Sequence, residues 1–154
     1  MIPGSAVQAQ NVKMATLGFD LSPIGRVHSP LTQRSGAPRQ PWEDAPEAKL
    51  EIYAEFVEGL EGIQPGQDIW VLTWLHESRR SALKVYPRGD HRLTGVFATR
   101  SPDRPNPIGL HRTKVLRVDE ERFILVRGIE AIDGTPVIDI KPVLGGEATP
   151  LVKG

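Results

Sequence analysis

The sequence predicts an all-β fold: a closed or nearly closed β-barrel of short, mainly antiparallel strands with at most short helices. Glycine and proline supply 15 and 14 of the 154 residues, and both residue types destabilise helix interiors. Short apolar runs recur along the chain, and turn residues separate them. Many short strands with little helix between them are typical of small all-β barrels.

The first part of the chain contains one short strand between two irregular segments. Residues 1–20 follow neither the helix nor the strand period, which predicts a flexible N-terminal arm ahead of a single domain at residues 21–154. Pro23–His28 is a candidate strand that Pro30 closes. Residues 31–46 are rich in proline and poor in large apolar residues. They predict a long loop, and loops of this length inside compact domains are commonly either functional or disordered.

Two strands and one short helix are expected next. Lys49–Tyr53 alternates apolar and charged residues, as a strand does, and Glu55–Leu60 predicts one or two helical turns. Asp68–His76 is the strongest strand prediction, because aromatic and branched residues occupy both of its faces. A small barrel has only one interior, so we expect part of this strand to be covered by a second copy of the chain.

The middle of the chain is mostly loop. Residues 77–92 are polar and basic, and they predict a loop. Thr94–Thr99 is a candidate short strand. Residues 100–109 contain three prolines and are therefore neither a helix nor a central strand.

Two hairpins are expected to complete the domain. Thr113–Val118 and Arg122–Val126 flank a short charged turn, and Gly128–Ile132 and Pro136–Ile140 flank an Asp-Gly-Thr turn. Asp-Gly between two apolar runs is a strong hairpin signal.

Composition excludes several classes of protein. The chain has 17.0 kDa and 39% hydrophobic residues, which fits one packed domain. It has no cysteine, so we expect no disulfide and a reducing, cytoplasmic location. Its four histidines lack the spacing of a metal motif, so no metal is expected. No apolar run approaches the roughly 18 residues of a membrane span, and no signal peptide is evident.

Two proline-bracketed segments are candidate binding loops. Arg100, Arg104 and Asn106 lie where three prolines restrict the backbone. Guanidinium and amide groups held in this way suit carboxylates, phosphates or base edges. The alternative is a structural crossover whose arginines pair with Asp103 or with backbone carbonyls. Pro38–Pro41, with the sequence Pro-Arg-Gln-Pro, repeats the arrangement, and two such segments in one small domain favour a site.

His76 and Glu77 end the most apolar strand and are candidates for proton transfer. An imidazole can take or give a proton near neutral pH, and a carboxylate can orient it or face a cation. The alternative is a half-exposed strand end without chemistry.

The charge distribution is uneven although the net charge is zero. Between Ser78 and Arg104 there are seven Lys or Arg residues against two acids, and such a loop can bind a polyphosphate backbone. The alternative is an ordinary solvated loop. The candidate substrate-binding residues in and beside it are Arg79, Arg80, Arg88, Arg104 and Asn106.

Several motifs, taken in order, point to one family. They are Pro23–Gly25 with Ser29–Pro30, Pro38–Pro41, Trp70–His76, Gly95–Arg100 running into Arg104–Gly109, and Asp133–Pro142. Together they resemble the TsaA-like family, whose best-known members are the TrmO tRNA methyltransferases. The resemblance covers roughly residues 21–144. Several long motifs in the right order are far more specific than one short pattern.

The resemblance implies an S-adenosylmethionine-dependent methyltransferase on a β-barrel, forming a homodimer with the cofactor near the subunit interface. The TrmO reaction methylates N6 of threonylcarbamoyladenosine next to the anticodon of tRNA. His76 is our candidate for the base, and Glu77 and Asp133 are carboxylates suited to a cationic cofactor. By position in the motifs, the implied cofactor contacts are Pro38, Arg39, Gln40, His76, Glu77, Arg100, Leu110, Asp133, Gly134, Thr135 and Pro136.

The sequence departs from the family pattern in three ways. It resembles a short form, because larger bacterial members carry an additional C-terminal domain, and Asp68 stands where many relatives have a histidine. The first twenty or so residues also lie outside the resemblance. Two alternatives therefore stay open. One is a module that binds S-adenosylmethionine or a nucleotide without catalysis. The other is a methyltransferase for another RNA or a small-molecule acceptor.

Overall fold

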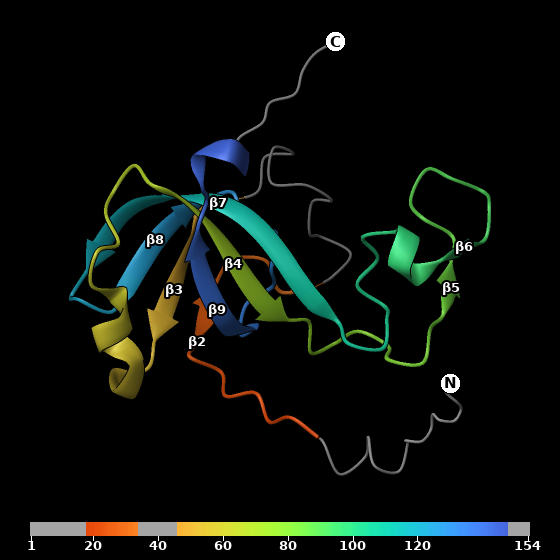
Figure 1. Ribbon diagram of the computed structural model, residues 1–154, viewed down its shortest axis with the longest axis horizontal. Coiled ribbons are helices and arrows are strands. Elements are labelled where there is room, and N and C mark those ends of the chain that lie inside the picture. Colours follow the sequence, from red (N-terminus) through yellow and green to blue (C-terminus); the bar gives the residue numbers. More distant parts are fainter. Residues whose placement is uncertain (1–17, 34–45, 148–154) are drawn as a thin grey trace.

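The chain folds into a six-stranded closed barrel with a small two-stranded sheet to one side (Figure 1). The computed structural model describes residues 18–33 and 46–147. Every pair of neighbouring strands is antiparallel, in the order β2, β3, β8, β7, β4, β9 around the barrel. The barrel strands are β2 (Gly25–His28), β3 (Ala48–Ile52), β4 (Asp68–Trp74), β7 (Ile108–Asp119), β8 (Phe123–Arg127) and β9 (Pro136–Pro142).

The remaining elements are short. β5 (Lys84–Val85) and β6 (Thr94–Gly95) form the side sheet, and the helical segments are the 3-10 turns η2 (Ala54–Leu60), η3 (Val96–Ala98) and η4 (Gly145–Glu147). The predicted all-β barrel with at most short helices is therefore confirmed. None of the helices in the described part of the chain is long and apolar enough to cross a lipid bilayer.

The barrel interior is filled by every second residue of its strands. Burial alternates along β3 and β4, so that Leu50, Ile52, Ile69 and Val71 point inward with at most 1% of their surface exposed. This is the two-residue period that a strand with one core face requires. The outward residues of β4 are half-buried, so the second apolar face of this strand lies on the outside of the barrel.

Most of the predicted strands form. The candidate strands at Pro23–His28, Lys49–Tyr53 and Asp68–His76 correspond to β2, β3 and β4, and the charged turn joins β7 to β8 as a hairpin. β7 begins earlier than expected, at Ile108, because the last prolines of the loop stop just before it. The predicted arm and the proline-rich loop lie largely outside the described residues, at 1–17 and 34–45.

The middle of the chain differs from the prediction. The expected strand at Thr94–Thr99 is only two residues long, because the backbone turns into η3, where the Thr99 N–H bonds the Val96 carbonyl. Its partner β5 forms inside the segment expected to be a loop, at residues 77–92. Val96 points inward and is buried. Its burial explains why this segment contains apolar residues although it forms almost no strand.

The second predicted hairpin is wrong. β9 pairs with β2 and β4 and closes the barrel, whereas residues 128–132 join no strand. Gly128 has φ +67°, a conformation that glycine adopts without strain, and it ends β8. Ile129 and Ala131 then pack in the core as irregular chain. Their apolar character reflects burial without strand pairing.

Candidate functional site

Three motifs meet at one end of the barrel, where β4 ends and where β7 and β9 begin. Thr73, near the end of β4, pairs with Gly109 on one side and with Val137 on the other. This register brings the residues that follow β4, the start of β7 and the turn before β9 to the same end. The implied cofactor contacts that the structure describes therefore come from three neighbouring strand ends.

The turn at Asp133–Pro136 is anchored to the end of β2. The Asp133 N–H bonds the Leu31 carbonyl at 2.6 Å, and the Gly134 N–H bonds the Val27 carbonyl at 2.8 Å. Gly134 has φ +85°, which favours glycine at this position. The Thr135 hydroxyl is buried and donates to the Ile132 carbonyl at 2.7 Å. The turn is held firmly, while Asp133 and Gly134 stay exposed.

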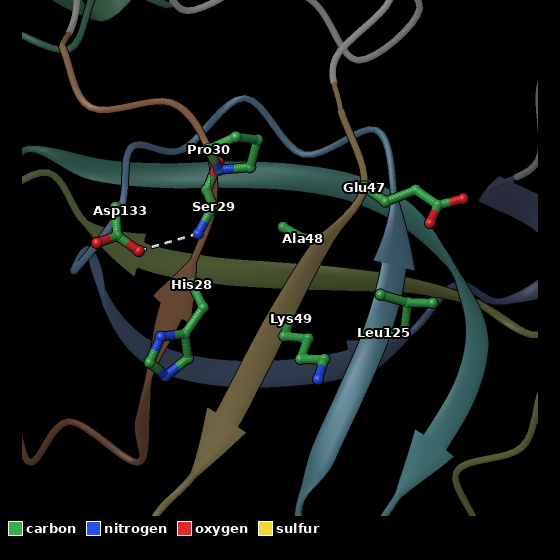
Figure 2. Close-up of a pocket in the computed structure, with 8 residues that line it drawn as sticks. All are labelled: His28, Ser29, Pro30, Glu47, Ala48, Lys49, Leu125 and Asp133. Atoms are coloured by element: carbon green, nitrogen blue, oxygen red, sulfur yellow. Dashed lines mark hydrogen bonds between the residues drawn. The ribbon is translucent and has the colours of Figure 1, made fainter.

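Asp133 also stands at the edge of an open hollow on the outer wall of the barrel, shown in Figure 2. Its Oδ1 accepts a hydrogen bond from the Ser29 N–H at 3.0 Å. That bond orients one carboxylate oxygen towards β2. The hollow lies against β2, β3 and β8 and is lined by residues of all three strands.

His76 and Glu77 follow β4 and are both partly exposed, with 38% and 52% of their side chains accessible. The His76 Nε2 lies 4.0 Å from the Glu77 Oε2. The chain just before them is fixed, because the Leu75 N–H bonds the Pro107 carbonyl at 2.8 Å. An imidazole and a carboxylate thus stand side by side at an accessible strand end, which is suited to proton transfer or to binding a cation.

Arg100 and Leu110, both implied cofactor contacts, touch each other. The Arg100 Nη2 donates to the Leu110 carbonyl at 3.3 Å. Both residues are exposed, Leu110 to 42%. Leu110 pairs with Leu72 of β4, so the guanidinium reaches the beginning of β7 from the loop that precedes it.

Arginines in and next to the proline loop, which we define as residues 100–109, make contacts within the protein. The Arg104 guanidinium donates to the carbonyls of Val96 and Thr99. Arg79 pairs with Asp103, with Nε and Oδ2 3.5 Å apart. These contacts tie the proline loop to η3 and to the chain that follows β4.

Arg80 is held from two sides. Its guanidinium carbon lies 5.0 Å from the centroid of the Trp74 ring, a distance typical of a cation–π contact. Its Nε donates to the Pro105 carbonyl at 2.8 Å, and its Nη2 donates to the Asn106 Oδ1 at 3.1 Å. Arg88, by contrast, is exposed on the loop between β5 and β6.

A buried polar network at the same barrel end was missed by the sequence analysis. The His111 Nε2 lies 2.8 Å from the Thr73 Oγ1, and its Nδ1 lies 2.6 Å from the Glu130 Oε1. Thr73 is fully buried and His111 is 3% exposed. The Glu130 Oε2 is buried without a hydrogen-bond partner in the described part of the chain. The network links β4 and β7 to the irregular segment that leads into the turn.

One signal in the sequence points to this network. His111 falls on the inward phase of the apolar alternation that continues through Thr113 and Val115. A histidine on a buried face needs polar partners. Its partners come from a different strand and from an irregular segment, so the spacing along the chain does not identify them.

Two further predictions concern the Pro-Arg-Gln segment and a metal. Pro38, Arg39 and Gln40 lie outside the described residues. Within residues 18–33 and 46–147, no three His, Cys, Asp or Glu side chains gather as metal ligands would.

Large apolar side chains are exposed at the start of β7 and in the segment that carries the side sheet, and we call this set of residues the apolar patch. Phe97 is 82% exposed, and Ile108 and Leu110 are each 42% exposed. The remaining members of the patch are the exposed residues Leu83, Tyr86 and Leu93. Exposed apolar side chains that gather on one surface are commonly covered by another protein.

Comparison with known proteins gives consistent results. A family model described as the tRNA-methyltransferase O N-terminal domain matches residues 26–146. A probable S-adenosyl-L-methionine-binding protein of Methanothermobacter thermautotrophicus is 42% identical over 129 residues, covering 84% of this chain and 93% of that protein. An S-adenosyl-L-methionine-binding protein of Archaeoglobus fulgidus is 44% identical over 121 residues, covering 79% of this chain and 86% of the relative.

Solved structures agree with the fold. The crystal structure of TrmO from Pseudomonas aeruginosa superposes with a TM-score of 0.69 at 32% sequence identity. The match covers 88% of this chain and 61% of the solved chain. The present chain therefore spans less than two thirds of the length of that structure.

Proposed function

The chain belongs to the family of the tRNA-methyltransferase O N-terminal domain, and from this premise we propose that it methylates N6 of threonylcarbamoyladenosine, next to the anticodon of tRNA, with S-adenosylmethionine as methyl donor. One observation carries the proposal. The family match spans residues 26–146, and the family motifs within it converge at one end of the barrel.

The residues at this end suit a cationic cofactor with an adenosine group. Glu77 and Asp133 supply two accessible carboxylates, and a carboxylate attracts a sulfonium charge. The Arg100 guanidinium supplies hydrogen-bond donors. Leu110 supplies apolar surface. We assign the cofactor to these residues, together with His76, Thr135, Pro136 and the segment Pro38, Arg39 and Gln40.

S-adenosylmethionine, when bound, supplies a methyl group on a positively charged sulfur. The protein then has to align the acceptor nitrogen with that methyl group, exclude water and remove one proton. We propose that the His76 imidazole, which is accessible and lies beside Glu77, accepts the proton that the acceptor nitrogen loses. The N–H of a ureido group is more acidic than that of an aromatic amine, so a modest base is sufficient.

We propose that two copies of the chain pair through the apolar patch around Phe97, Ile108 and Leu110. Covering this patch would remove exposed aromatic and aliphatic side chains from water. Leu110 belongs both to the patch and to the assigned cofactor contacts, so pairing here would place the cofactor near the interface. Light scattering tests this point, and a monomer at micromolar concentration would contradict it.

We propose that tRNA binds to the basic segment between β4 and β7, at residues 78–104. Arg88 and Lys84 are exposed there, and lysine and arginine side chains bind phosphates. Arg79, Arg80, Arg104 and Asn106 hold this segment in shape through their contacts with the protein. The proposed reaction takes place in the cytoplasm, where tRNA is modified.

A second candidate is a protein that binds S-adenosylmethionine without transferring its methyl group. It is favoured by the names of the two archaeal relatives, which describe cofactor binding alone. Incubation with radiolabelled S-adenosylmethionine and tRNA, either carrying or lacking threonylcarbamoyladenosine, separates the two. Label that enters only the modified tRNA supports the proposed reaction. Cofactor binding without label in any RNA supports the second candidate, and label in another acceptor identifies a different methyltransferase.

A further inference from the structure

The hollow on the outer wall of the barrel has a polar pattern that the proposed function leaves unexplained. His28, Lys49 and Leu125 form one cross-strand row on β2, β3 and β8, because Lys49 pairs with both of the others. Figure 2 shows this row along the lower side of the hollow, with Asp133 above its left end beside Ser29 and Glu47 above its right end.

Lys49 supplies a positive charge to the hollow. Among the described residues it forms no ion pair, and its ammonium group lies 5.7 Å from the centroid of the Phe123 ring. The side chain is exposed, so an anionic group in the hollow can reach it. Ala48 and Leu125 supply apolar surface to the lining of the hollow.

The surface next to this row is also cationic. Glu51 is surrounded by His28, Arg26 and Arg122, which lie 2.7, 3.1 and 3.1 Å from its carboxylate oxygens. Hydrogen bonds from these groups, that of His28 first, lower the pKa of Glu51 to about 2. The single carboxylate is fully engaged, and the two guanidinium groups exceed it in charge.

The opposite side of the hollow is anionic. Asp133 is exposed and one of its oxygens is oriented by the Ser29 N–H. Glu47 is exposed as well and also lines the hollow, just before β3 and two residues before Lys49. The hollow therefore presents positive charge on one side and negative charge on the other.

We propose that this hollow binds an amino-acid group, with its carboxylate towards Lys49 and His28 and its hydrogen-bond donors towards Asp133 and Glu47. The inference rests on the proposed function, because both reactants of that reaction carry such a group. The cofactor has the amino-acid end of methionine, and the acceptor has a threonine carboxylate next to a hydroxyl. Asp133 belongs to the turn assigned to the cofactor, so the hollow lies beside the reaction centre.

Paired small-molecule probes test the assignment by calorimetry. S-adenosylmethionine and 5′-methylthioadenosine differ by the amino-acid group of the cofactor and by the positive charge on its sulfur, so the comparison that counts is the effect of each Lys49 variant on the affinity for each compound. The nucleoside N6-threonylcarbamoyladenosine and adenosine differ by the threonylcarbamoyl group, which carries the amino acid of the acceptor. Lys49→Gln removes the charge at the hollow, Lys49→Glu reverses it, and Lys141→Gln on β9, away from the hollow, is the control. Thermal melting establishes that all variants fold.

We expect Lys49→Gln to weaken the amino-acid-bearing member of one pair about fivefold or more, and Lys49→Glu to weaken it further. The shorter member of that pair and the control variant should be unaffected. A response of S-adenosylmethionine assigns the hollow to the cofactor, and a response of the threonylcarbamoyl nucleoside assigns it to the acceptor.

Two results would overturn the inference. Wild type and both Lys49 variants could bind all four probes with equal affinity while the protein still methylates tRNA. This result would refute amino-acid binding in the hollow and leave the proposed function intact. A wild-type protein that binds neither amino-acid-bearing probe would refute both the inference and the proposed function.

Discussion

Gly109 in β7 lies against the buried polar pair and leaves no room for a side chain. A Cβ atom at this position would lie 2.6 Å from the His111 Nε2 and closer still to the Thr73 Oγ1. Non-bonded carbon atoms prefer separations of about 3.5–4.0 Å. Thr73 and His111 are both buried, so neither can move aside into solvent.

Gly109→Ala therefore has to break the 2.8 Å contact between Thr73 and His111 or displace the backbone of β7. Leaving a buried hydrogen-bonding group without its partner costs about 1–3 kcal/mol, and overpacking costs about 1–3 kcal/mol. Because either change accommodates the new methyl group, we expect the free energy of unfolding to fall by about 1–3 kcal/mol, a large part of the stability of an ordinary domain. Leu110 is the next residue, so the affinity for S-adenosylmethionine should fall as well.

Urea denaturation followed by tryptophan fluorescence measures the loss of stability, and calorimetry measures the affinity. Gly95→Ala is the matched control, because Gly95 has φ −62° and a Cβ there meets nothing within 4 Å. If the two variants unfold at the same urea concentration, the polar pair is not packed against Gly109 in the way that the structure describes.

Substitutions of Glu51, His76, Arg100 and Arg88 test the roles of these polar side chains in stability, catalysis and binding. Since the pKa of Glu51 is lowered from 4.5 to about 2, its stabilising contribution is present above pH 4.5 and is lost as the pH falls from 4.5 towards 2. Glu51→Gln should therefore flatten acid unfolding curves and cost about 1–3 kcal/mol at pH 7. His76→Ala should reduce methyl transfer much more than it reduces cofactor affinity, which single-turnover kinetics and calorimetry separate. Arg100→Ala should weaken cofactor binding by about 1–3 kcal/mol, measured by calorimetry, if its guanidinium donates to the cofactor. Arg88→Gln should weaken tRNA binding and flatten its salt dependence in filter-binding assays, whereas Arg80→Gln should also lower the melting temperature because Arg80 holds the proline loop.

The barrel was predictable because its strands alternate, but burial and strand pairing are separate properties. β3 and β4 show the two-residue period of strands with one core face. Residues 128–132 are equally apolar, yet they pack in the core as irregular chain after the positive φ of Gly128. An apolar side chain indicates that a residue is buried. It does not indicate whether the backbone of that residue pairs with another strand.

The candidate site was predictable where a motif is continuous in sequence. His76 and Glu77 could be placed at an accessible strand end, and the Asp133–Gly134 pair could be placed in a turn, from local patterns alone. The partners of His111 could not be predicted, because they depend on the register of β4 against β7 and on the path of an unpaired segment. Arg104 shows the same limit, since its carbonyl partners become neighbours only through the turn at η3.

The His111 network accounts for how a turn outside the sheet keeps its position relative to β7. Residues 129–135 have no ladder partner, so side chains and single backbone bonds must hold them. Glu130 bonds His111 of β7 on one side, and the Asp133 and Gly134 N–H groups bond carbonyls at the end of β2 on the other. Leu110 directly precedes His111, and Asp133 follows Glu130 by three residues. The pair of His111 and Glu130 therefore helps to set the distance between the two motifs to which we assign the cofactor, together with the backbone bonds that hold the turn against β2.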